Sequence, residues 1–320
     1  MAEQSRLLEQ TVEAEGPLLP VDTSSIRQSL ARAFAPWRRR PLGIMGAIIV
    51  VAVFSLAIAA PWLAPHSPQS FVGKRLESPN STYLLGTNNL GQDVLSRTIY
   101  GAQVSMAVAF SATFIGVAAG TVLGIVSGYF GGWLDLGVQR VMEVLASFPA
   151  IMLALIVVAA LGRPKESGSD VFMLCWQLRS LSLAISLGFI FGVMRVIRSA
   201  VLKERDLPYI EAARALGAST PRIMFRHILP NVFPLIIVTF STIIGAVILI
   251  EAGISFLGYG VSIGTPSWGL DLSNRNREFF LVAPWVMAAP SIALILAVLG
   301  FNFLGDTLRD ILDPRLRGSR

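Results

Sequence analysis

The chain has little of what an enzyme or a metal protein needs. Its 320 residues include one cysteine and two histidines, so an internal disulfide is excluded. Cys175 is expected to be a small hydrophobic side chain, and it forms no metal site with His66 and His227, which the predicted topology puts on opposite sides of a membrane. Gly73-Lys74 lacks the preceding glycine of a phosphate-binding loop. The sequence therefore offers no catalytic, metal or nucleotide site of its own.

Charge is also scarce. Charged residues make up 14% of the chain against 53% hydrophobic residues, and the mean hydropathy is +0.64. A soluble protein of this length needs more polar surface. The sequence therefore predicts an all-α integral membrane protein, and the lipid bilayer is its first expected partner.

Apolar runs define the spans, because a helix needs about 20 apolar residues to cross the bilayer core. Six transmembrane helices are predicted, at 42–63, 104–129, 136–161, 181–196, 232–250 and 281–304. The fourth run is short, so its helix is expected to extend into the residues on either flank. The predicted organisation is a tail at 1–41, an anchor at 42–63, an external loop at 64–103, a five-helix core at 104–304 with a loop at 203–231, and a tail at 305–320.

The distribution of basic residues predicts the orientation. With the amino terminus inside, 18 of the 26 Lys and Arg residues lie on the cytoplasmic side. Both termini and the loop 203–231 are therefore expected in the cytoplasm. The first apolar run begins only at Leu42 and is long enough to span, so no cleavable signal peptide is expected. The net charge of +6 follows from topology, and no nucleic acid partner is expected.

The loop 203–231 is predicted to be a helix-turn-helix. Asp206 is expected to cap a helix that starts at Leu207 and Pro208, and Gly217 to end it in the left-handed conformation. Thr220-Pro221 is expected to start a second helix that Pro230-Asn231 closes. The two arms share an apolar face (Ile210, Ala213, Ile223, Met224, Ile228) and a basic face (Arg214, Arg222, Arg226). That shape suits docking into a groove on another protein.

The spacing of Glu211-Ala212-Ala213, Gly217 and Leu229-Pro230 resembles the signature cytoplasmic loop of ABC importer permeases. His227 stands where the family often has Ile. The resemblance implies a type I ABC importer permease fold in a bacterial inner membrane, with this loop as the coupling helix that seats on an ATPase. The implied coupling residues are Glu211, Ala212, Ala213, Gly217, Ala218, Leu229 and Pro230. The alternative is an ordinary amphipathic loop.

The same resemblance implies the partners. They are a second homologous permease subunit, two ATPase subunits or one fused ATPase, and an external solute-binding protein. ATP and Mg²⁺ would be bound by the ATPases, so this chain would be a non-catalytic subunit without a cofactor. A secondary transporter or channel is disfavoured because the clear spans are nearly bare of ionisable groups, and a membrane enzyme is disfavoured because two separated histidines supply no reactive constellation.

A second informative stretch, 85–97, precedes the second span. Gly86 and Gly91 are expected to mark turns, and Asp93 to cap the helix that follows. The stretch resembles the dipeptide and oligopeptide branch of the family. Asn88 and Gln92 stand where relatives often carry Asp and Arg, so the turns are expected without an ion pair there. This loop either shapes the helix entry or contacts an external partner.

Weaker motifs of the same branch lie at 251–258, 266–269, 305–310 and 313–315. The resemblance implies a short peptide as cargo, and nickel or another small solute is the alternative because the related permeases look alike at these motifs. Glu251 lies about 30 Å along its helix from Asn231, near the outer interface. It is expected either to border the pore or support a gate, or to be an interfacial anchor, with Phe256 and Leu257 as apolar plugs or as core residues.

Three local features predict packing. Gly116, Gly120, Gly124 and Gly128 recur every four residues, which favours close contact between helices. Phe148-Pro149 is expected to kink the third span. Asp135 and Glu143 are expected to cap a helix or to form ion pairs.

Overall fold

The computed structural model describes residues 40–161, 170–262, 264–273, 276 and 278–312. Nearly all of the predicted tail 1–41 and half of the predicted tail 305–320 therefore lie outside the described residues, as do the motif at 313–315 and the side chain of Cys175.

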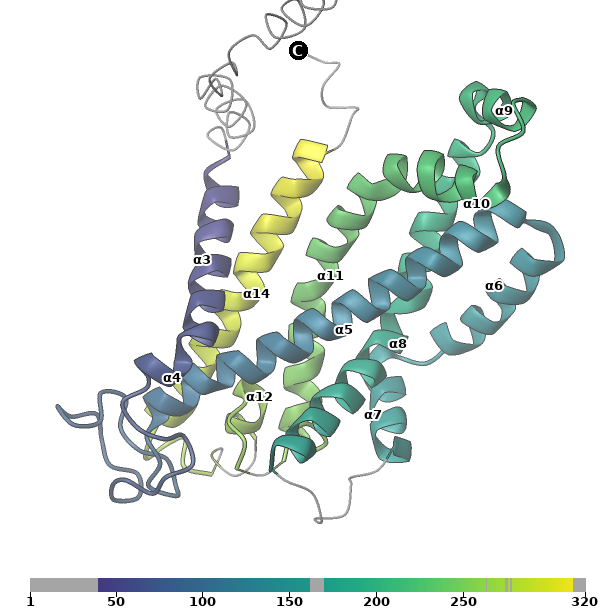
Figure 1. Ribbon diagram of the computed structural model, residues 1–320. Coiled ribbons are helices and arrows are strands. Elements are labelled where there is room, and N and C mark those ends of the chain that lie inside the picture. The colour runs from purple at the N-terminus through teal and green to yellow at the C-terminus, as the bar shows by residue number, and fades with distance from the viewer. Residues whose placement is uncertain (1–39, 162–169, 263, 274–275, 277, 313–320) are drawn as a thin grey trace, which may run out of the picture. The chain divides into compact units, whose positions relative to one another are not determined.

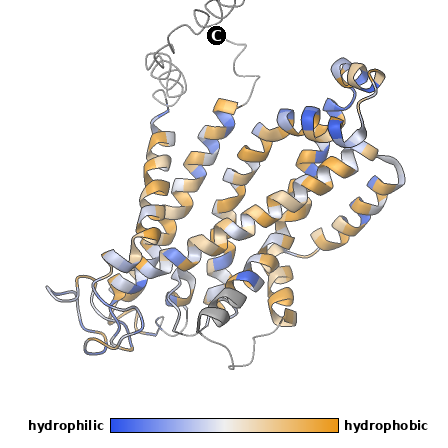
Figure 2. Ribbon diagram, viewed as in Figure 1, coloured by the Kyte–Doolittle hydropathy of each residue, from blue (hydrophilic) through white to orange (hydrophobic). Residues whose placement is uncertain are grey.

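Five long helices carry the fold (Figure 1): α3 Pro41–Ile58, α5 Val94–Phe130, α8 Asp170–Glu204, α11 Leu229–Phe256 and α14 Trp285–Leu312. Each contains a window apolar enough to cross a membrane, and Figure 2 shows hydrophobic residues along all of them. The described residues contain no β-strand, only the isolated bridge between Thr87 and Asp93. The predicted all-α membrane fold is confirmed.

The third predicted span is broken rather than straight. Helices α6 (Gly132–Ala146) and α7 (Ala150–Leu161) meet at an angle of 90°. The predicted kink at Phe148-Pro149 is confirmed, since proline cannot donate the helical hydrogen bond. α7 has 12 residues and is about 18 Å long, too short to cross a core of about 30 Å alone. The described residues thus give five full spans, or six if the bent pair counts as one.

The fourth and fifth spans are longer than predicted. The apolar part of α8 runs from Leu178 to Glu204, so it borrows from both flanks as expected. The fifth span begins at Thr220 instead of Val232, because α10 (Thr220–Arg222) and the π-helical turn η1 (Ile223–Ile228) continue directly into α11.

Small residues bring α5 and α8 together. A Cβ placed on Gly120 would lie 2.6 Å from the Cβ of Val193, and one on Gly124 would lie 2.9 Å from the Cβ of Ile197. Side chains larger than hydrogen would push the helices apart. The predicted packing role of the four-residue glycine repeat is confirmed.

The remaining helices assemble around this pair. α14 packs along α11, and α3 lies beside α14, where a Cβ on Gly46 would lie 2.7 Å from the backbone nitrogen of Leu304. Short helices α4 (Ala60–Leu63) and α12 (Trp268–Asp271) lie at one end of the bundle. α9 (Pro208–Ala215) lies at the opposite end, where α3 begins and α14 ends (Figure 1).

Candidate coupling site

The predicted coupling loop forms an elbow, which comprises α9, the turn at 216–219, α10 and η1. α9 begins at Pro208, and the residue before it, Leu207, is extended with no side-chain cap. The predicted cap by Asp206 is therefore wrong: its carboxylate lies 3.3 Å from the side chain of Arg205. Proline disfavours helical geometry in the residue before it, so the chain enters the helix at Leu207, one residue later than Asp206 could cap.

Gly217 ends α9 as predicted. Its φ is +81°, and its N–H donates to the carbonyl of Arg214 at 3.0 Å. The N–H of Ala218 donates to the carbonyl of Ala213, also at 3.0 Å. This pair of hydrogen bonds is a Schellman motif, which favours glycine at the left-handed position. The motif leaves Leu216 at the tip with 88% of its surface exposed.

The second arm starts at Thr220 as predicted, but the predicted end at Pro230-Asn231 is wrong. The N–H of Leu229 bonds to the carbonyl of Met224, five residues back, and the helix then runs on to Phe256. Pro230 sits in the first turn after this wide π turn, where it needs no donor. The elbow and the fifth span are therefore one continuous helical segment.

The apolar face of the elbow packs on its own subunit. Ile210, Ile223 and Ile228 are fully buried against Val193, Ile197 and Val201 of α8 and against Val117 and Ile125 of α5. Met224 is buried there too, and Ala213 is half-buried. The predicted apolar face thus packs with side chains of α5 and α8, and the opposite face of the elbow is the exposed one.

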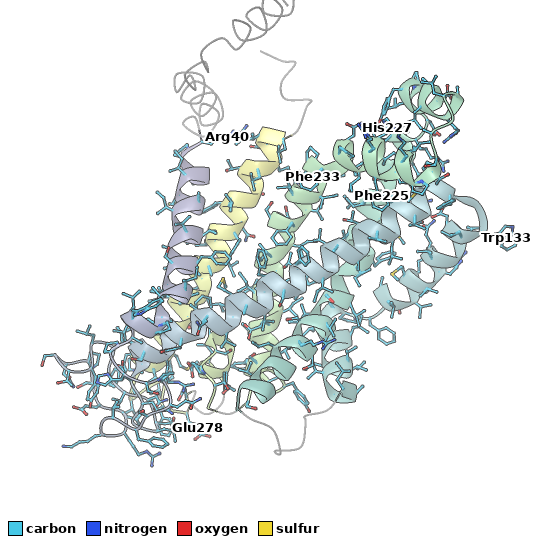
Figure 3. The ribbon with its side chains drawn as sticks, viewed as in Figure 1. Arg40, Trp133, Phe225, His227, Phe233 and Glu278 are labelled. Atoms are coloured by element: carbon cyan, nitrogen blue, oxygen red, sulfur yellow. The ribbon has the colours of Figure 1, made fainter. Side chains whose placement is uncertain are left out.

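That outer face combines basic and apolar side chains. Arg214, Arg222 and Arg226 are exposed, together with Leu216 and Phe225, whose side chain is 66% exposed. Figure 3 shows Phe225 and His227 on this end of the molecule. Of the predicted coupling residues, Glu211, Ala212, Gly217 and Pro230 are exposed, and Ala213, Ala218 and Leu229 are half-buried.

A hydrogen-bonded triad that the sequence analysis missed joins α9 to its neighbours. The hydroxyl of Tyr209 donates to Glu204 at the end of α8 at 2.5 Å, and it accepts from the amide of Asn231 at 2.7 Å. Partial burial, then the neighbouring Glu204 carboxylate, raises the pKa of Tyr209, so the phenol keeps the proton that it donates. Asn231 lies 22 and 27 positions from the other two residues, so spacing alone gave no signal.

An ion pair fixes the first turn of α6 to α8. Arg198 of α8 donates to both carboxylate oxygens of Asp135 at 2.6 and 2.5 Å, and Ser127 of α5 contacts the same group. Glu143 pairs with Arg140 at 2.9 Å. The prediction that Asp135 and Glu143 cap or pair is confirmed, and the partners are now known.

At the opposite end of the bundle, the loop between α4 and α5 has the predicted turns. Gly86 and Gly91 have φ values of +69° and +75°, and Asp93 accepts from the N–H of Ser96 at 3.0 Å as the cap of α5. The amide of Asn88 donates to the side-chain oxygen of Gln92 at 2.9 Å. A neutral amide pair therefore occupies the place where relatives were expected to carry an ion pair.

Glu251 lies near the carboxyl-terminal end of α11, and its side chain is fully buried. It accepts hydrogen bonds from Ser255 at 2.8 Å and from Ser267 at 3.3 Å. Phe256 and Leu257, five and six residues further on, are exposed on the isolated chain. Their assignment to a pore or gate stays a prediction.

Comparisons with known proteins agree with this architecture. The family described as binding-protein-dependent transport system inner membrane component matches residues 120–318, and the N-terminal TM domain of oligopeptide transport permease C matches residues 29–79. The dipeptide transport system permease protein DppC of Alkalihalophilus pseudofirmus is 36% identical over 96% of this chain and 99% of its own length. The chain belongs to this permease family. The permease also shares 37% identity with the glutathione transport system permease protein GsiD of Pectobacterium atrosepticum, over 88% of this chain and 92% of that protein.

A solved structure supports the fold of the permease. A chain from inward-facing conformations of the MetNI methionine ABC transporter matches with a TM-score of 0.52 and 19% identity. The match covers 69% of the permease and 96% of that chain. At this identity the likeness shows the type I ABC importer permease fold and nothing of cargo.

Proposed function

We propose that the permease forms half of the translocation pathway of an ATP-driven importer for short peptides. A second homologous permease completes the pathway, two ATPases or one fused ATPase drive it, and an external solute-binding protein delivers the cargo. Relatives named for dipeptide and glutathione transport favour peptides over the nickel alternative. The permease itself is non-catalytic, and ATP and Mg²⁺ are held by the ATPases.

The protein lies in a bacterial inner membrane with both termini and the elbow in the cytoplasm. The excess of Lys and Arg on that side supports this orientation. So does the placement of the elbow at the end of the bundle where α3 begins and α14 ends.

The observation that carries the coupling role is the division of the elbow into a buried root and an exposed tip. Ile210, Ile223 and Ile228 fix the root to α5 and α8, so force on the tip reaches the membrane helices. Leu216 and Phe225 present apolar surface beside arginines, which suits a groove with an apolar floor and an acidic rim. Exposed apolar surface with a charged border is typical of a protein interaction site.

The continuous helix from Thr220 to Phe256 gives this force a route. Its 37 residues span about 55 Å, so closure of the ATPases would tilt the whole fifth span as a rigid body. The pathway would thereby alternate between its two openings, and selectivity would lie mainly in the binding protein.

Two leucines allow a matched test. Leu216 at the elbow is 88% exposed and Leu281 at the opposite end is 94% exposed. In the purified complex of both permeases and the ATPases, Leu216→Asp should release the ATPases and lower their affinity at least about tenfold, since a central apolar anchor is worth about 2 kcal/mol or more. Leu281→Asp should leave ATPase binding unchanged. Equal binding by the two variants would refute the proposed docking face.

A further inference from the structure

The outer end of the permease carries a hook, residues 267–273 around α12, that is built into the ends of two spans. Trp268 is fully buried, and its indole N–H donates to the carbonyl of Thr98 on α5 at 2.9 Å. A Cβ on Gly269 would lie 2.6 Å from the Cα of Ala252 on α11. The hook therefore touches both α5 and α11 without a gap for a further side chain.

The buried carboxylate of Glu251 lies at this junction. One of its oxygens accepts from Ser255 of its own helix and from Ser267, the residue that caps α12. Ser105 of α5 faces the same carboxylate. Within the described residues, the second oxygen of Glu251 and the hydroxyl of Ser105 are both buried without a hydrogen-bond partner. A carboxyl group is costly to bury, and here its hydrogen bonds join α11 to the residue that caps α12.

A second fastening joins the hook to α5. Arg97 donates to Asp271, the last residue of α12, at 2.6 and 3.0 Å, and both side chains are buried. The side-chain oxygen of Gln92 accepts from Arg97 at 3.1 Å, and Asn276 donates to the carbonyl of Asp271 at 2.8 Å. The hook is thus fixed to α5 by an ion pair and to α11 by Glu251.

We propose that Glu251 is a positioning residue that fastens the hook to the outer end of α11, so that movement of the cytoplasmic elbow is carried through one helix to the external surface. The inference rests on the proposed coupling function. The elbow lies at one end of the segment Thr220–Phe256, and Glu251 lies five residues from the other. A tilt of this segment displaces the hook with it, and the external loops beside the hook change position when the ATPases close.

The chemistry of the contact explains why a carboxyl-sized acceptor is required. Ser255 and Ser267 both need an acceptor at one point between α11 and α12. The amide introduced by Glu251→Gln keeps an oxygen at that point, whereas Glu251→Ala leaves two buried hydroxyl groups without it. The two variants therefore separate loss of the hydrogen-bond acceptor from replacement of the carboxyl group.

The test uses the complete complex of two permeases, ATPases and binding protein in lipid nanodiscs. Spin labels are placed at Leu249 on α11 and Leu272 after α12, in a Cys175→Ser background. In the wild type the distance between the labels should be the same without nucleotide and with ATP trapped. In Glu251→Ala the distance distribution should broaden, and stimulation of ATP hydrolysis by loaded binding protein should fall by about fivefold or more. Glu251→Gln should restore both readouts.

Further variants keep the test decisive. If Glu251→Ala does not assemble, Ser267→Ala removes one partner and should broaden the same distance, while Ser199→Ala, whose hydroxyl bonds to Val196 of its own helix, should not. The inference is overturned if the wild-type label distance changes between nucleotide states, or if neither Glu251→Ala nor Ser267→Ala alters distance or stimulation. A wild-type complex that shows no stimulation at all would instead count against the proposed function.

Discussion

Substitution of Gly217 tests the geometry of the coupling elbow. Its φ of +81° lies in the left-handed region, and a Cβ placed there meets no atom within 4 Å. A substitution therefore introduces backbone strain without a steric clash, and it leaves the buried root of the elbow intact. Gly217→Ala and Gly217→Val therefore test the backbone conformation at the end of α9 without changing side-chain packing.

The size of the expected effect follows from the free-energy cost of the left-handed backbone conformation. This cost is about 1–2 kcal/mol for an L-residue and is lowest for Asn. If the strained elbow relaxes away from the docked shape, the competent fraction falls about 5–30-fold. Gly217→Val should lie at the upper end of this range because a β-branched residue tolerates positive φ least. Gly217→Asn should lie near wild type.

The assay is the affinity of purified ATPase subunits for the permease pair in nanodiscs, together with cargo-stimulated ATP hydrolysis. The stability of the permease in thermal unfolding should fall by no more than the strain of about 1–2 kcal/mol, because a Cβ at Gly217 meets no atom within 4 Å. The reasoning fails if Gly217→Val binds the ATPases as tightly as wild type, or if Gly217→Asn is as impaired as Gly217→Val.

Two further predictions concern the membrane body. Arg198→Ala leaves the largely buried Asp135 without its partner and should destabilise the permease by about 2–3 kcal/mol, whereas Asp135→Asn combined with Arg198→Ala should be less destabilised than Arg198→Ala alone. Thermal unfolding in detergent measures both, and simple addition of the two losses would contradict the pairing. Gly120→Leu places a side chain where a Cβ already lies 2.6 Å from Val193, so it should cost about 1–3 kcal/mol or prevent folding. Gly137→Leu, where a Cβ meets nothing within 4 Å, is the control, and equal losses of folded protein would refute the close-packing argument.

Patterns local in sequence predicted the fold well. Apolar runs located the spans, the glycine repeat located the contact of α5 with α8, and Pro149 located the bend between α6 and α7. Gly217, Gly86 and Gly91 were predicted in turns, because a positive φ needs only the local backbone. These features depend on residues within one or two helical turns.

The errors arose where a local signal competed with helical continuity. Pro230 indicated a helix boundary, but the preceding π turn lets the helix run through it. Asp206 indicated a cap, but Pro208 set the boundary at Leu207. In both cases the proline that affects the helix was recognised, but its position relative to the helix boundary was not.

Contacts between distant segments were outside the reach of sequence patterns. Arg97 and Asp271 are 174 residues apart, and Asp135 and Arg198 are 63 apart. Each residue reads as an ordinary loop or terminal charge until the fold brings its partner near. The burial of Glu251 is of the same kind, because Ser267 covers it from another element.

The most direct test of the account is uptake by sealed vesicles that contain the permease and its homologous partner. Loaded binding protein and ATP are supplied, with or without the ATPase subunits, and entry of a labelled short peptide is measured. The account predicts uptake only when the ATPases are present and able to hydrolyse ATP. Uptake at the same rate by permeases alone would contradict it.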